Sequence, residues 1–568
     1  MSRDTNPQST ALGRRQTLRG LTTTGLALLA ASGTPHLANG DSASDTEPSD
    51  RSGDSTTGQR RQQRAFELRT RIAREALNLD EPFPDPETRW ETDPYDRHIS
   101  SYTKGLPHDE DGLVDEDAYE ALRTAMTTGD PAAFPAIPLG DGFRQLKDPQ
   151  SAFGFELVGP DPQQHVVPSP PAYDSEEMAA QVVDAYWRML SLDVPFVKYD
   201  QCPPPVLCEA AAELASFDAY SQPMQDKPIR PGTMFELMDL PGPRVSQFML
   251  KPYARGALQV EQKIRTIADD VSYLTDYDEW LSVRDGAAPT GEPQYDETER
   301  YVHDGRSLAE FVHEDVPNQA FDSAVLLLLG REAPVNPTMP FLGAPLDRNI
   351  PFSREGSSVP FVNFGFFDAI DAVDSMVDIA LSAAWYNKWG VHDLLRPETY
   401  GGHVHLTKTG QREFPIDESL LESEAVQHTY ERHGTYLLPQ LYPEGAPMHP
   451  AYPSGHATVA GACATALKAY FDESYVFPNP VRSNADGTEL VPVDAEVTIR
   501  SEADKLAVNV ANGRIFAGVH YPVDAVEGLM LGEKIALSVL KGRKALSNQV
   551  EEFEGWELTR FDGTTVTI

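Results

Sequence analysis

Three short segments, far apart in the chain, carry residues that bind anions or transfer protons. The first is "WYNKWGVHDLLRPETYGG", residues 385–402. The second is "MHPAYPSGHATVAGACATALKAYF", residues 448–471, and the third is "NGRIFAGVHYPVDAVEG", residues 512–528. Each places cations, a hydroxyl or imidazoles beside a predicted helix end, where proteins commonly bind oxyanions. Together the three segments predict a pocket for an oxyanion of phosphate shape.

In the first segment, Trp385, Lys388 and His392 are spaced i, i+3 and i+7 and so share one helical face. Pro397 disfavours α geometry at Arg396, so we expect the helix to end there. Arg396 can then turn back beside Lys388, and two such cations bind an oxyanion between them. The alternative is an ordinary solvated basic helix end.

In the second segment, a helix is expected to begin after Pro453, at Ser454, Gly455 and His456. The N-terminus of a helix presents free N–H groups and the positive end of a dipole, and glycine lets the backbone approach a ligand. Ser454 as a simple N-cap is the alternative. His456 lies inside the first turn and is placed for proton transfer, and a further imidazole, His449, precedes it by seven positions.

In the third segment, Arg514 and His520 are six positions apart and would point to different faces of one unbroken helix. Pro522 suits the first turn of a new helix, so His520 is expected at a junction where both side chains can converge. Asp524 is a candidate to orient the His520 imidazole. An ordinary acidic residue in a first helical turn remains the alternative for Asp524.

Helices must position these segments. Apolar residues spaced three and four apart predict helices over 175–194, 320–330, 366–395, 456–471, 502–519 and 523–542. Strand-like alternation is limited, the best case being the C-terminal "WELTRFDGTTVTI". The fold class is therefore mainly α. Long Pro-rich connections at 328–362 and 434–455 are of the kind that carry binding or assembly.

The composition limits the partners. Among 568 residues, 87 are acidic and 47 are Lys or Arg, which gives a net charge of −40. Such a surface repels nucleic acid and anionic membranes, since both need a basic face. Strong acidity on an otherwise ordinary globular composition indicates adaptation to very high salt, which screens the self-repulsion.

The N-terminus reads "GRRQTLRGLTTTGLALLAASG", with Arg14 and Arg15 before a short apolar stretch. This pattern is typical of a twin-arginine export signal, predicted over residues 1–39, so we expect a secreted or cell-surface protein. Residues 40–62, rich in Ser, Asp and Thr, are predicted to be a disordered linker. No apolar stretch reaches the ~20 residues that span a bilayer, so no membrane contact is expected after the signal is removed.

The three cysteines are Cys202, Cys208 and Cys463. Cys202 and Cys208 bracket "PPPVL", where a small disulfide loop and two free thiols are both possible. Cys463 lies in "AGACATA" and is expected to be a buried packing residue. There is no CxxC pair and no HExxH, so a zinc site is not predicted.

The three segments resemble the vanadium-dependent haloperoxidases. That family's pattern is Lys, seven residues and Arg-Pro, then Pro-Ser-Gly-His, then Arg, five residues and His, and the seven-residue spacer is similar to the algal bromoperoxidase branch. Acid and lipid phosphatases of the same superfamily share the pocket. Trp385, His449 and "SSYTKGLPHDEDGLV" (100–114) also match the algal enzymes. The resemblance covers residues 63–568.

The resemblance implies a mainly helical fold with two four-helix bundles and few short strands, divided into an N-terminal part (63–330) and a vanadate-binding part (331–568). It implies vanadate as cofactor, with His520 as the vanadium ligand. The oxygens of vanadate would be bound by Lys388, Arg396, Ser454, Gly455 and Arg514. His456 would act as acid and base, Lys388 would polarise bound peroxide, and His449 and Trp385 would tune halide access.

The implied reaction is oxidation of halide by hydrogen peroxide to hypohalous acid, with bromide preferred, iodide accepted and an unidentified organic acceptor halogenated. Algal members are commonly dimers or larger homo-oligomers. Some relatives hold a structural divalent cation, but no ligand spacing here places one. Two alternatives stay open: a secreted phosphatase that forms a phosphohistidine on His520, and an acidic surface protein without activity.

Overall fold

A computed structural model describes residues 57–77, 88–202, 204–218, 228–340, 360–547 and 553–568. The described residues from 65 onward form one compact unit, and residues 57–64 belong to a second. The export signal predicted over 1–39 lies outside the described residues, as does most of the linker predicted over 40–62. Residues 57–62 differ from that prediction, because they begin helix α1 (Thr57–Leu77), whose Gln, Arg, Glu and Ala residues favour helix.

Helices dominate the described chain, as predicted. Before residue 340 they are α2 (Arg89–Thr92), η2 (Asp96–His98), α3 (Glu116–Thr128), η3 (Phe134–Ala136), η4 (Pro149–Phe153), η5 (Pro162–Gln164), α4 (Glu176–Leu190), η6 (Phe196–Lys198), α5 (Pro205–Leu214), α6 (Gln247–Leu250), α7 (Tyr277–Arg284), α8 (Gly305–Phe311) and α9 (Gln319–Gly330). After it they are α10 (Phe366–Asp374), α11 (Met376–Trp385), the π-helix η7 (Tyr386–His392), α12 (Pro397–Thr409), α13 (Glu418–Leu421), α14 (Glu424–His433), α15 (Gly455–Tyr470), α16 (Ile499–Phe516) and α17 (Pro522–Leu546).

Strands in the described residues form three short antiparallel pairs. They are β1 (Tyr253–Arg255) with β2 (Leu258–Val260), β3 (Val481–Ser483) with β4 (Leu490–Pro492), and β5 (Glu557–Thr559) with β6 (Thr565–Thr567). The last pair confirms the C-terminal strand prediction. It is a hairpin in which Leu558 pairs with Val566.

The prediction of one helix over 366–395 that ends at Arg396 was wrong. The segment is broken into α10, α11 and η7, and helical structure ends at His392. Asp393 follows with φ 40°, in the left-handed region, and so turns the chain. Arg396 is extended, as Pro397 requires, but it is the N-cap of a new helix, α12. Proline is well accommodated at a first helical position, and the prediction overlooked this use of it.

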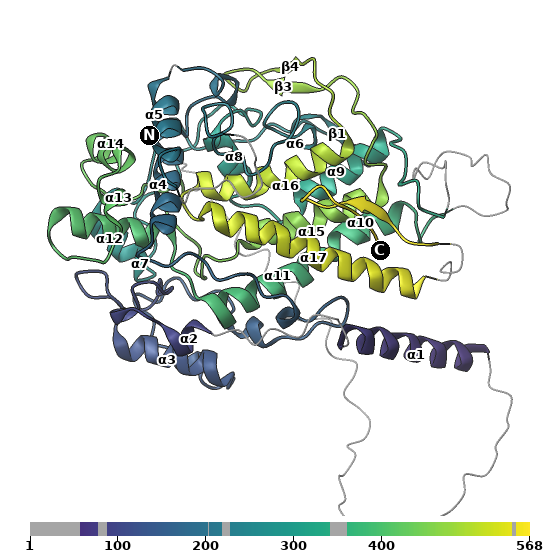
Figure 1. The fold of residues 1–568 in the computed structure, drawn as a ribbon, viewed down its shortest axis with the longest axis horizontal. Helices are drawn as coiled ribbons and strands as arrows, with labels where there is room; N and C mark the ends of the chain where they lie inside the picture. Colours follow the sequence, from purple (N-terminus) through teal and green to yellow (C-terminus); the bar gives the residue numbers. More distant parts are fainter. Residues whose placement is uncertain (1–56, 78–87, 203, 219–227, 341–359, 548–552) are drawn as a thin grey trace, which may run out of the picture. The chain divides into compact units, whose positions relative to one another are not determined.

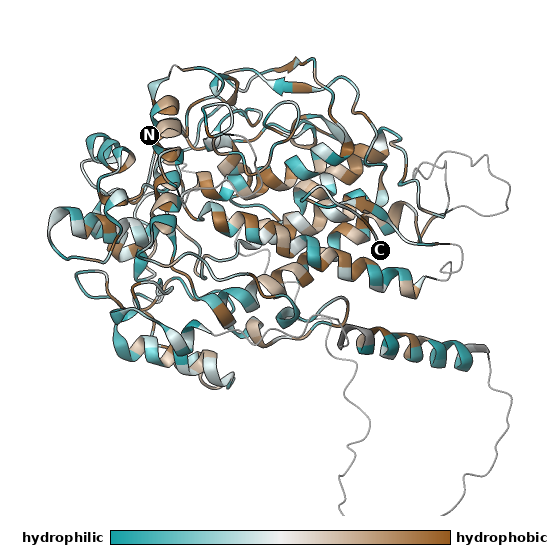
Figure 2. Ribbon diagram, in the orientation of Figure 1, coloured by the Kyte–Doolittle hydropathy of each residue, from teal (hydrophilic) through white to brown (hydrophobic). Residues whose placement is uncertain are grey.

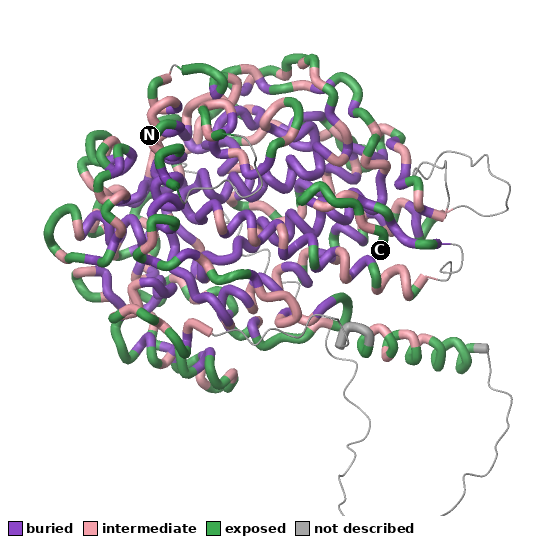
Figure 3. Tube along the Cα trace, viewed as in Figure 1, coloured by how far each residue is buried: buried purple, intermediate pink, exposed green. Residues whose placement is uncertain are grey.

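The described part of the 65–568 unit is built around α15, α16 and α17, which lie side by side with α8 and α11 packed against them (Figure 1). Hydrophobic residues recur along these helices (Figure 2), and Figure 3 shows them largely buried. Every residue of α15 from Ala457 to Tyr470 is buried. The run of small apolar residues after "PSGH" is therefore core, and it includes the buried Cys463.

Glycines set the distance between α15 and α17. A Cβ added at Gly532 would lie 2.0 Å from the Thr458 carbonyl oxygen, and one at Gly461 would lie 2.2 Å from that of Leu529. Only glycine permits backbones to approach this closely. The contact aligns the first turns of the two helices, and the Ser454 N–H donates to the Asp524 carbonyl oxygen at 2.9 Å.

Three further observations bear on the sequence predictions. Cys202 and Cys208 are joined by a disulfide bond, so the disulfide alternative is the correct one. No helix among the described residues is long and apolar enough to cross a membrane. Within the same described ranges, no cluster of three or more His, Cys, Asp or Glu side chains has the arrangement of a cation site.

Candidate active site

His520 lies at the junction of α16 and α17, as predicted, and is 2% exposed. Its Nδ1 lies 2.7 Å from Oδ2 of Asp524. Because a carboxylate accepts, Nδ1 carries the proton and Nε2 keeps its lone pair. Burial, and then the charges of Arg396 and Lys388, hold the pKa of His520 well below its usual range. The imidazole is therefore neutral, which is the form that binds a metal.

Arg396 joins the first segment to the third. Its Nη1 lies 3.0 Å from Nε2 of His520 and donates to the Val519 carbonyl oxygen at 2.8 Å. Its Nη2 donates to Nδ1 of His449 at 2.9 Å, and its Nε donates to the His449 carbonyl oxygen at 2.9 Å. The guanidinium is fully buried, so these contacts fix its plane between two imidazoles.

Lys388 lies in the π-helix η7 and is also fully buried. Its Nζ donates to the carbonyl oxygens of Pro450 at 2.7 Å and Ala451 at 2.6 Å. An ammonium has three N–H groups, so these two bonds leave one for a further acceptor. Burial, followed by the charge of Arg396, lowers the pKa of Lys388 well below its usual range. An anion at this position would offset both effects.

Arg514 extends from α16 and is 4% exposed. Its Nη1 donates to the Val312 carbonyl oxygen at 2.7 Å, whereas its Nε is buried and has no hydrogen-bond partner among the described residues. A buried N–H group of a cation without an acceptor is costly. The unsatisfied Nε indicates that an acceptor belongs here.

The N-terminus of α15 lies beside these cations through its contact with α17. The Ser454 hydroxyl accepts from the Ala457 N–H at 3.4 Å, so the N-cap alternative describes its side chain in this structure. A Cβ on Gly455 would lie 3.2 Å from the Trp385 ring, so the position favours glycine. The first N–H groups of the helix have no partner within it and can donate to an anion.

His456 occupies the first turn of α15, and its side chain is 21% exposed. Its Nε2 lies 2.9 Å from Oδ1 of Asp315, in the segment after α8. Burial raises the pKa of Asp315, but His456 and Arg514 outweigh it and leave that pKa below its usual value. Asp315 is thus a carboxylate that can orient His456. The sequence prediction missed Asp315, because one acid among 87 carries no signal of its own.

Trp385 and His449 lie together beside the cations. Their ring centroids are 4.6 Å apart with the planes inclined at 40°. The Trp385 indole donates to the Lys147 carbonyl oxygen at 3.1 Å, which fixes the ring. Burial, and then Arg396 and Lys388, keep the pKa of His449 well below its usual range, so this imidazole is neutral.

The site has an excess of positive charge. Lys388, Arg396 and Arg514 are buried around His520, and Asp524 is the buried carboxylate paired with that histidine. Burial raises the pKa of Asp524 to about 7, which limits the charge it can supply. Uncompensated buried cations are unfavourable, and an oxyanion removes the imbalance. Vanadate fits this set, because its oxygens accept from the cations and its vanadium takes a lone pair such as that of Nε2.

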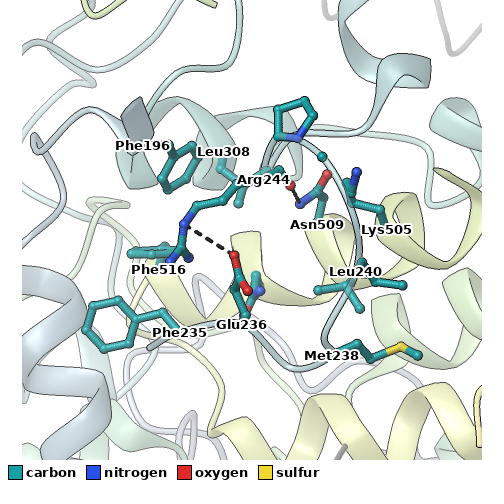
Figure 4. A pocket seen from close by; sticks show the side chains of 14 residues that line it. Phe196, Phe235, Glu236, Met238, Leu240, Arg244, Leu308, Lys505, Asn509 and Phe516 are labelled. Carbon is teal, nitrogen blue, oxygen red and sulfur yellow. Dashed lines mark hydrogen bonds and ion pairs between the residues drawn. The ribbon is translucent and has the colours of Figure 1, made fainter. Parts of the chain in front are cut away.

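The cavity in Figure 4 lies outside the cluster of cations around His520. It has a volume of about 30 Å³, and its lining includes Phe196, Phe235 and Phe516. A cavity of about 420 Å³ shares Phe196 and Arg244 with it. Neither contains a residue of the anion-binding set, and Arg244 faces Glu236 at 3.4 Å. Paired opposite charges do not select an oxyanion, so the chemistry is assigned to the cluster around His520.

Comparisons with known proteins agree with this geometry. The family model described as the VCPO second helical-bundle domain matches residues 372–549, which include all three segments in full. A vanadium-dependent bromoperoxidase of Ascophyllum nodosum is 35% identical over 499 residues, covering 83% of this chain and 86% of that protein. One of Corallina officinalis is 29% identical over 576 residues, covering 85% and 92%.

The fold of this chain is also similar to that of a solved bromoperoxidase structure. The homohexameric second vanadate-dependent bromoperoxidase of Ascophyllum nodosum, AnII, superimposes with a TM-score of 0.81, at 27% identity and over 94% of both chains. This confirms the predicted haloperoxidase fold. The relatives are peroxidases, which favours the predicted activity over the phosphatase and the inactive surface protein. This chain shares the fold of these relatives and matches their sequences over most of their length, so it belongs to the vanadium-dependent haloperoxidases, in their algal bromoperoxidase branch.

Proposed function

We propose that this protein binds vanadate and uses hydrogen peroxide to oxidise bromide, and also iodide, to hypohalous acid, which halogenates organic acceptors. The relatives' activity supports the reaction. One observation of the site carries the proposal: Asp524 holds the His520 proton on Nδ1, so the Nε2 lone pair faces a cluster of buried cations.

The net reaction fixes what the protein must do. Halide, hydrogen peroxide and one proton give hypohalous acid and water, so the halide loses two electrons, which peroxide accepts. Bound vanadate supplies a Lewis acid that activates peroxide toward halide without changing its own oxidation state. The protein must therefore hold a multiply charged anion, admit a halide and deliver a proton.

Holding the anion is the proposed role of the buried donors. His520 would bind vanadium through Nε2, whose lone pair accepts from Arg396 Nη1 at 3.0 Å when no vanadate is bound. Asp524 maintains the tautomer in which Nε2 carries that lone pair. The third N–H of Lys388 and the unsatisfied Nε of Arg514 donate to vanadate oxygens. The remaining donors are Arg396, Ser454 and the Gly455 N–H. Donors aimed in advance at a developing charge need no reorganisation during the reaction.

Proton delivery is the proposed role of His456. Its side chain is partly exposed, so it can exchange protons with solvent, and an imidazole can act as both acid and base. Asp315 orients the ring through the 2.9 Å contact at Nε2. We further propose that His449 and Trp385, which are packed together beside Arg396, shape the halide path.

The test is a vanadate titration of protein that has been freed of vanadate by dialysis at low pH. Bromide, iodide and chloride are assayed in parallel with peroxide and a phenolic dye, and nitrophenyl phosphate is assayed in the same preparation. We expect bromide and iodide turnover that saturates at one vanadate per chain and is absent from His520→Ala. Hydrolysis of the phosphate ester without halide oxidation would instead establish a phosphatase.

We also propose that the protein is a homo-oligomer. The solved relative AnII, which covers 94% of this chain, is homohexameric, and this supports an assembly of two or more copies. Light scattering coupled to size-exclusion chromatography in high salt measures the mass directly. A single peak at the mass of one chain, which is 62.6 kDa with residues 1–39 included, would exclude the assembly.

Export to a saline exterior is a further proposal. Arg14 and Arg15 support the twin-arginine route, and the Cys202–Cys208 disulfide supports an oxidising compartment. A folded reporter fused to residues 1–39 should reach the exterior, and replacing both arginines with lysine should retain it inside. The net charge of −40 supports a halophilic habitat. The melting temperature should therefore rise from 0.1 to 3 M KCl.

A further inference from the structure

The segment after α8, residues 312–315, contacts two proposed site residues at once. The Val312 carbonyl oxygen accepts from Arg514 at 2.7 Å. Three positions later, Asp315 meets His456 at 2.9 Å. A shift of this segment would therefore move the partners of both a vanadate-binding guanidinium and the proton donor.

His313 lies within this segment and is held by two acids. Its Nε2 lies 2.8 Å from Oε1 of Glu444, and its Nδ1 lies 3.6 Å from Oε1 of Glu310. The side chain is 8% exposed, and its ring stacks on Tyr442 with centroids 3.7 Å apart and planes inclined at 5°. Burial alone would lower the pKa of His313, but the two glutamates outweigh it and raise that pKa to about 9.

The groups packed around this imidazolium are themselves anchored. The Tyr442 hydroxyl donates to the Ala309 carbonyl oxygen at 2.7 Å, and Nη1 of Arg514 lies 3.4 Å from the same hydroxyl. The Glu444 carbonyl oxygen accepts from Lys104 at 3.0 Å and from Arg144 at 2.7 Å. The ring thus ties the segment to both the Glu444 loop and α8.

We propose that His313 is a positioning residue for the vanadate site: its ion pairs with the two glutamates fix segment 312–315, and through it the partners of Arg514 and His456. This inference rests on the proposed function, because it assigns a role relative to that site. A neutral side chain at 313 would remove the cation that lies between the carboxylates of Glu310, which is 9% exposed, and Glu444, which is 30% exposed. Such like charges repel, and they would displace the segment.

The experiment compares His313→Gln with His303→Gln in the full chain. His303 is the matched control, because it precedes α8 as His313 follows it, is 9% exposed and lies 3.3 Å from Asp304. Vanadate Kd is measured by equilibrium dialysis, and bromide turnover is measured separately. We expect His313→Gln to raise Kd about tenfold and lower kcat about tenfold or more, since small misplacements at a site have large effects. The control should stay within about twofold on both measures, as expected for a site away from the segment.

A pH series separates positioning from general damage. The ratio of variant to wild-type Kd should be about ten at pH 7 and approach one as pH rises through about 9, because wild type then loses the same charge. His313→Arg, which keeps a planar cation that can stack, should restore most of the affinity. A pH-independent ratio, or a Kd within twofold of wild type, would overturn the inference.

Two safeguards keep the result interpretable. If His313→Gln does not fold, Glu310→Gln removes one of the paired charges, and the pH at which wild-type affinity weakens should move lower; no movement counts against the inference. Binding is measured apart from turnover. A wild type that binds vanadate without oxidising halide would refute the proposed function, while the dialysis comparison still decides the role of His313.

Discussion

Asp524 contacts His520 through its side chain and the N-terminus of α15 through its backbone. Nδ1 of the histidine lies 2.7 Å from the carboxylate, and the backbone oxygen of the same aspartate accepts from the Ser454 N–H at 2.9 Å. One residue in the first turn of α17 therefore orients the proposed vanadium ligand and anchors the N-terminus of α15. The anchor would persist after the carboxylate is altered, so the two roles can be separated.

Replacing Asp524 with Asn should weaken vanadate binding about 10- to 100-fold, because an amide, which can donate as well as accept, no longer holds the His520 proton on Nδ1. Equilibrium dialysis of the variant measures the change. Asp504→Asn is the control, since Asp504 is equally buried and pairs with Lys468 at 2.8 Å away from the proposed ligand set. It should lower stability but leave vanadate Kd within about twofold. Equal losses of affinity in both variants would show a general structural effect.

Replacing Asp315 with Asn should lower kcat for bromide oxidation while largely sparing vanadate affinity. The carboxylate contacts His456 rather than the proposed vanadium ligand, and positioned acid–base groups contribute about 100- to 10,000-fold. A loss of at least about tenfold is expected, with a changed pH profile of kcat, when the orienting partner is removed. Turnover as a function of pH, with vanadate saturating, is the measurement. An unchanged profile would remove Asp315 from the mechanism.

The composition of the site was readable from sequence because its donors lie at helix ends with characteristic neighbours. Pro397, "PSGH" and Pro522 mark such ends. In the structure, Arg396 from the first segment contacts His449 from the second and His520 from the third. The convergence of the three segments depends on contacts that single segments do not encode. Gly461 and Gly532 allow α15 and α17 to approach closely. The sequence alone does not predict this role, because it does not show which carbonyl group lies opposite each glycine.

The features that the sequence analysis missed also depend on contacts between distant segments. Asp315 acquires its role from His456, 141 positions away. The π-helix η7 and the start of α12 were misassigned because local spacing does not distinguish a helix that widens and stops from one that continues. Local patterns thus predicted which groups do chemistry, and long-range packing decided which groups support them.

Stability should depend on pH through His313. Its pKa is raised to about 9 in the folded chain, so its contribution is fully present below the unfolded value near 6.5 and is lost as pH rises through 9. The shift corresponds to about 3 kcal/mol. Urea unfolding of wild type and His313→Gln at pH 6 and pH 10 should show the difference between them shrinking by roughly this amount. A constant difference would mean that His313 is uncharged in the fold.

The close approach of α15 and α17 should be sensitive to a single methyl group. Gly532→Ala places a Cβ 2.0 Å from the Thr458 carbonyl oxygen, and two helix backbones cannot yield as a flexible side chain can. We expect a loss of about 1 to 3 kcal/mol or more, together with weaker vanadate binding, because the first turns of both helices are displaced. Thermal unfolding and equilibrium dialysis measure the two effects.

Gly542→Ala is the control on the same helix, because nothing lies within 4 Å of its added Cβ. Alanine is the better helix former, so this variant should gain about 0.5 to 1 kcal/mol and bind vanadate normally. Opposite signs at two glycines of α17 would attribute the loss at Gly532 to contact with α15 and not to helix propensity. If both variants were stabilised with unchanged Kd, the spacing of these helices would not control the site.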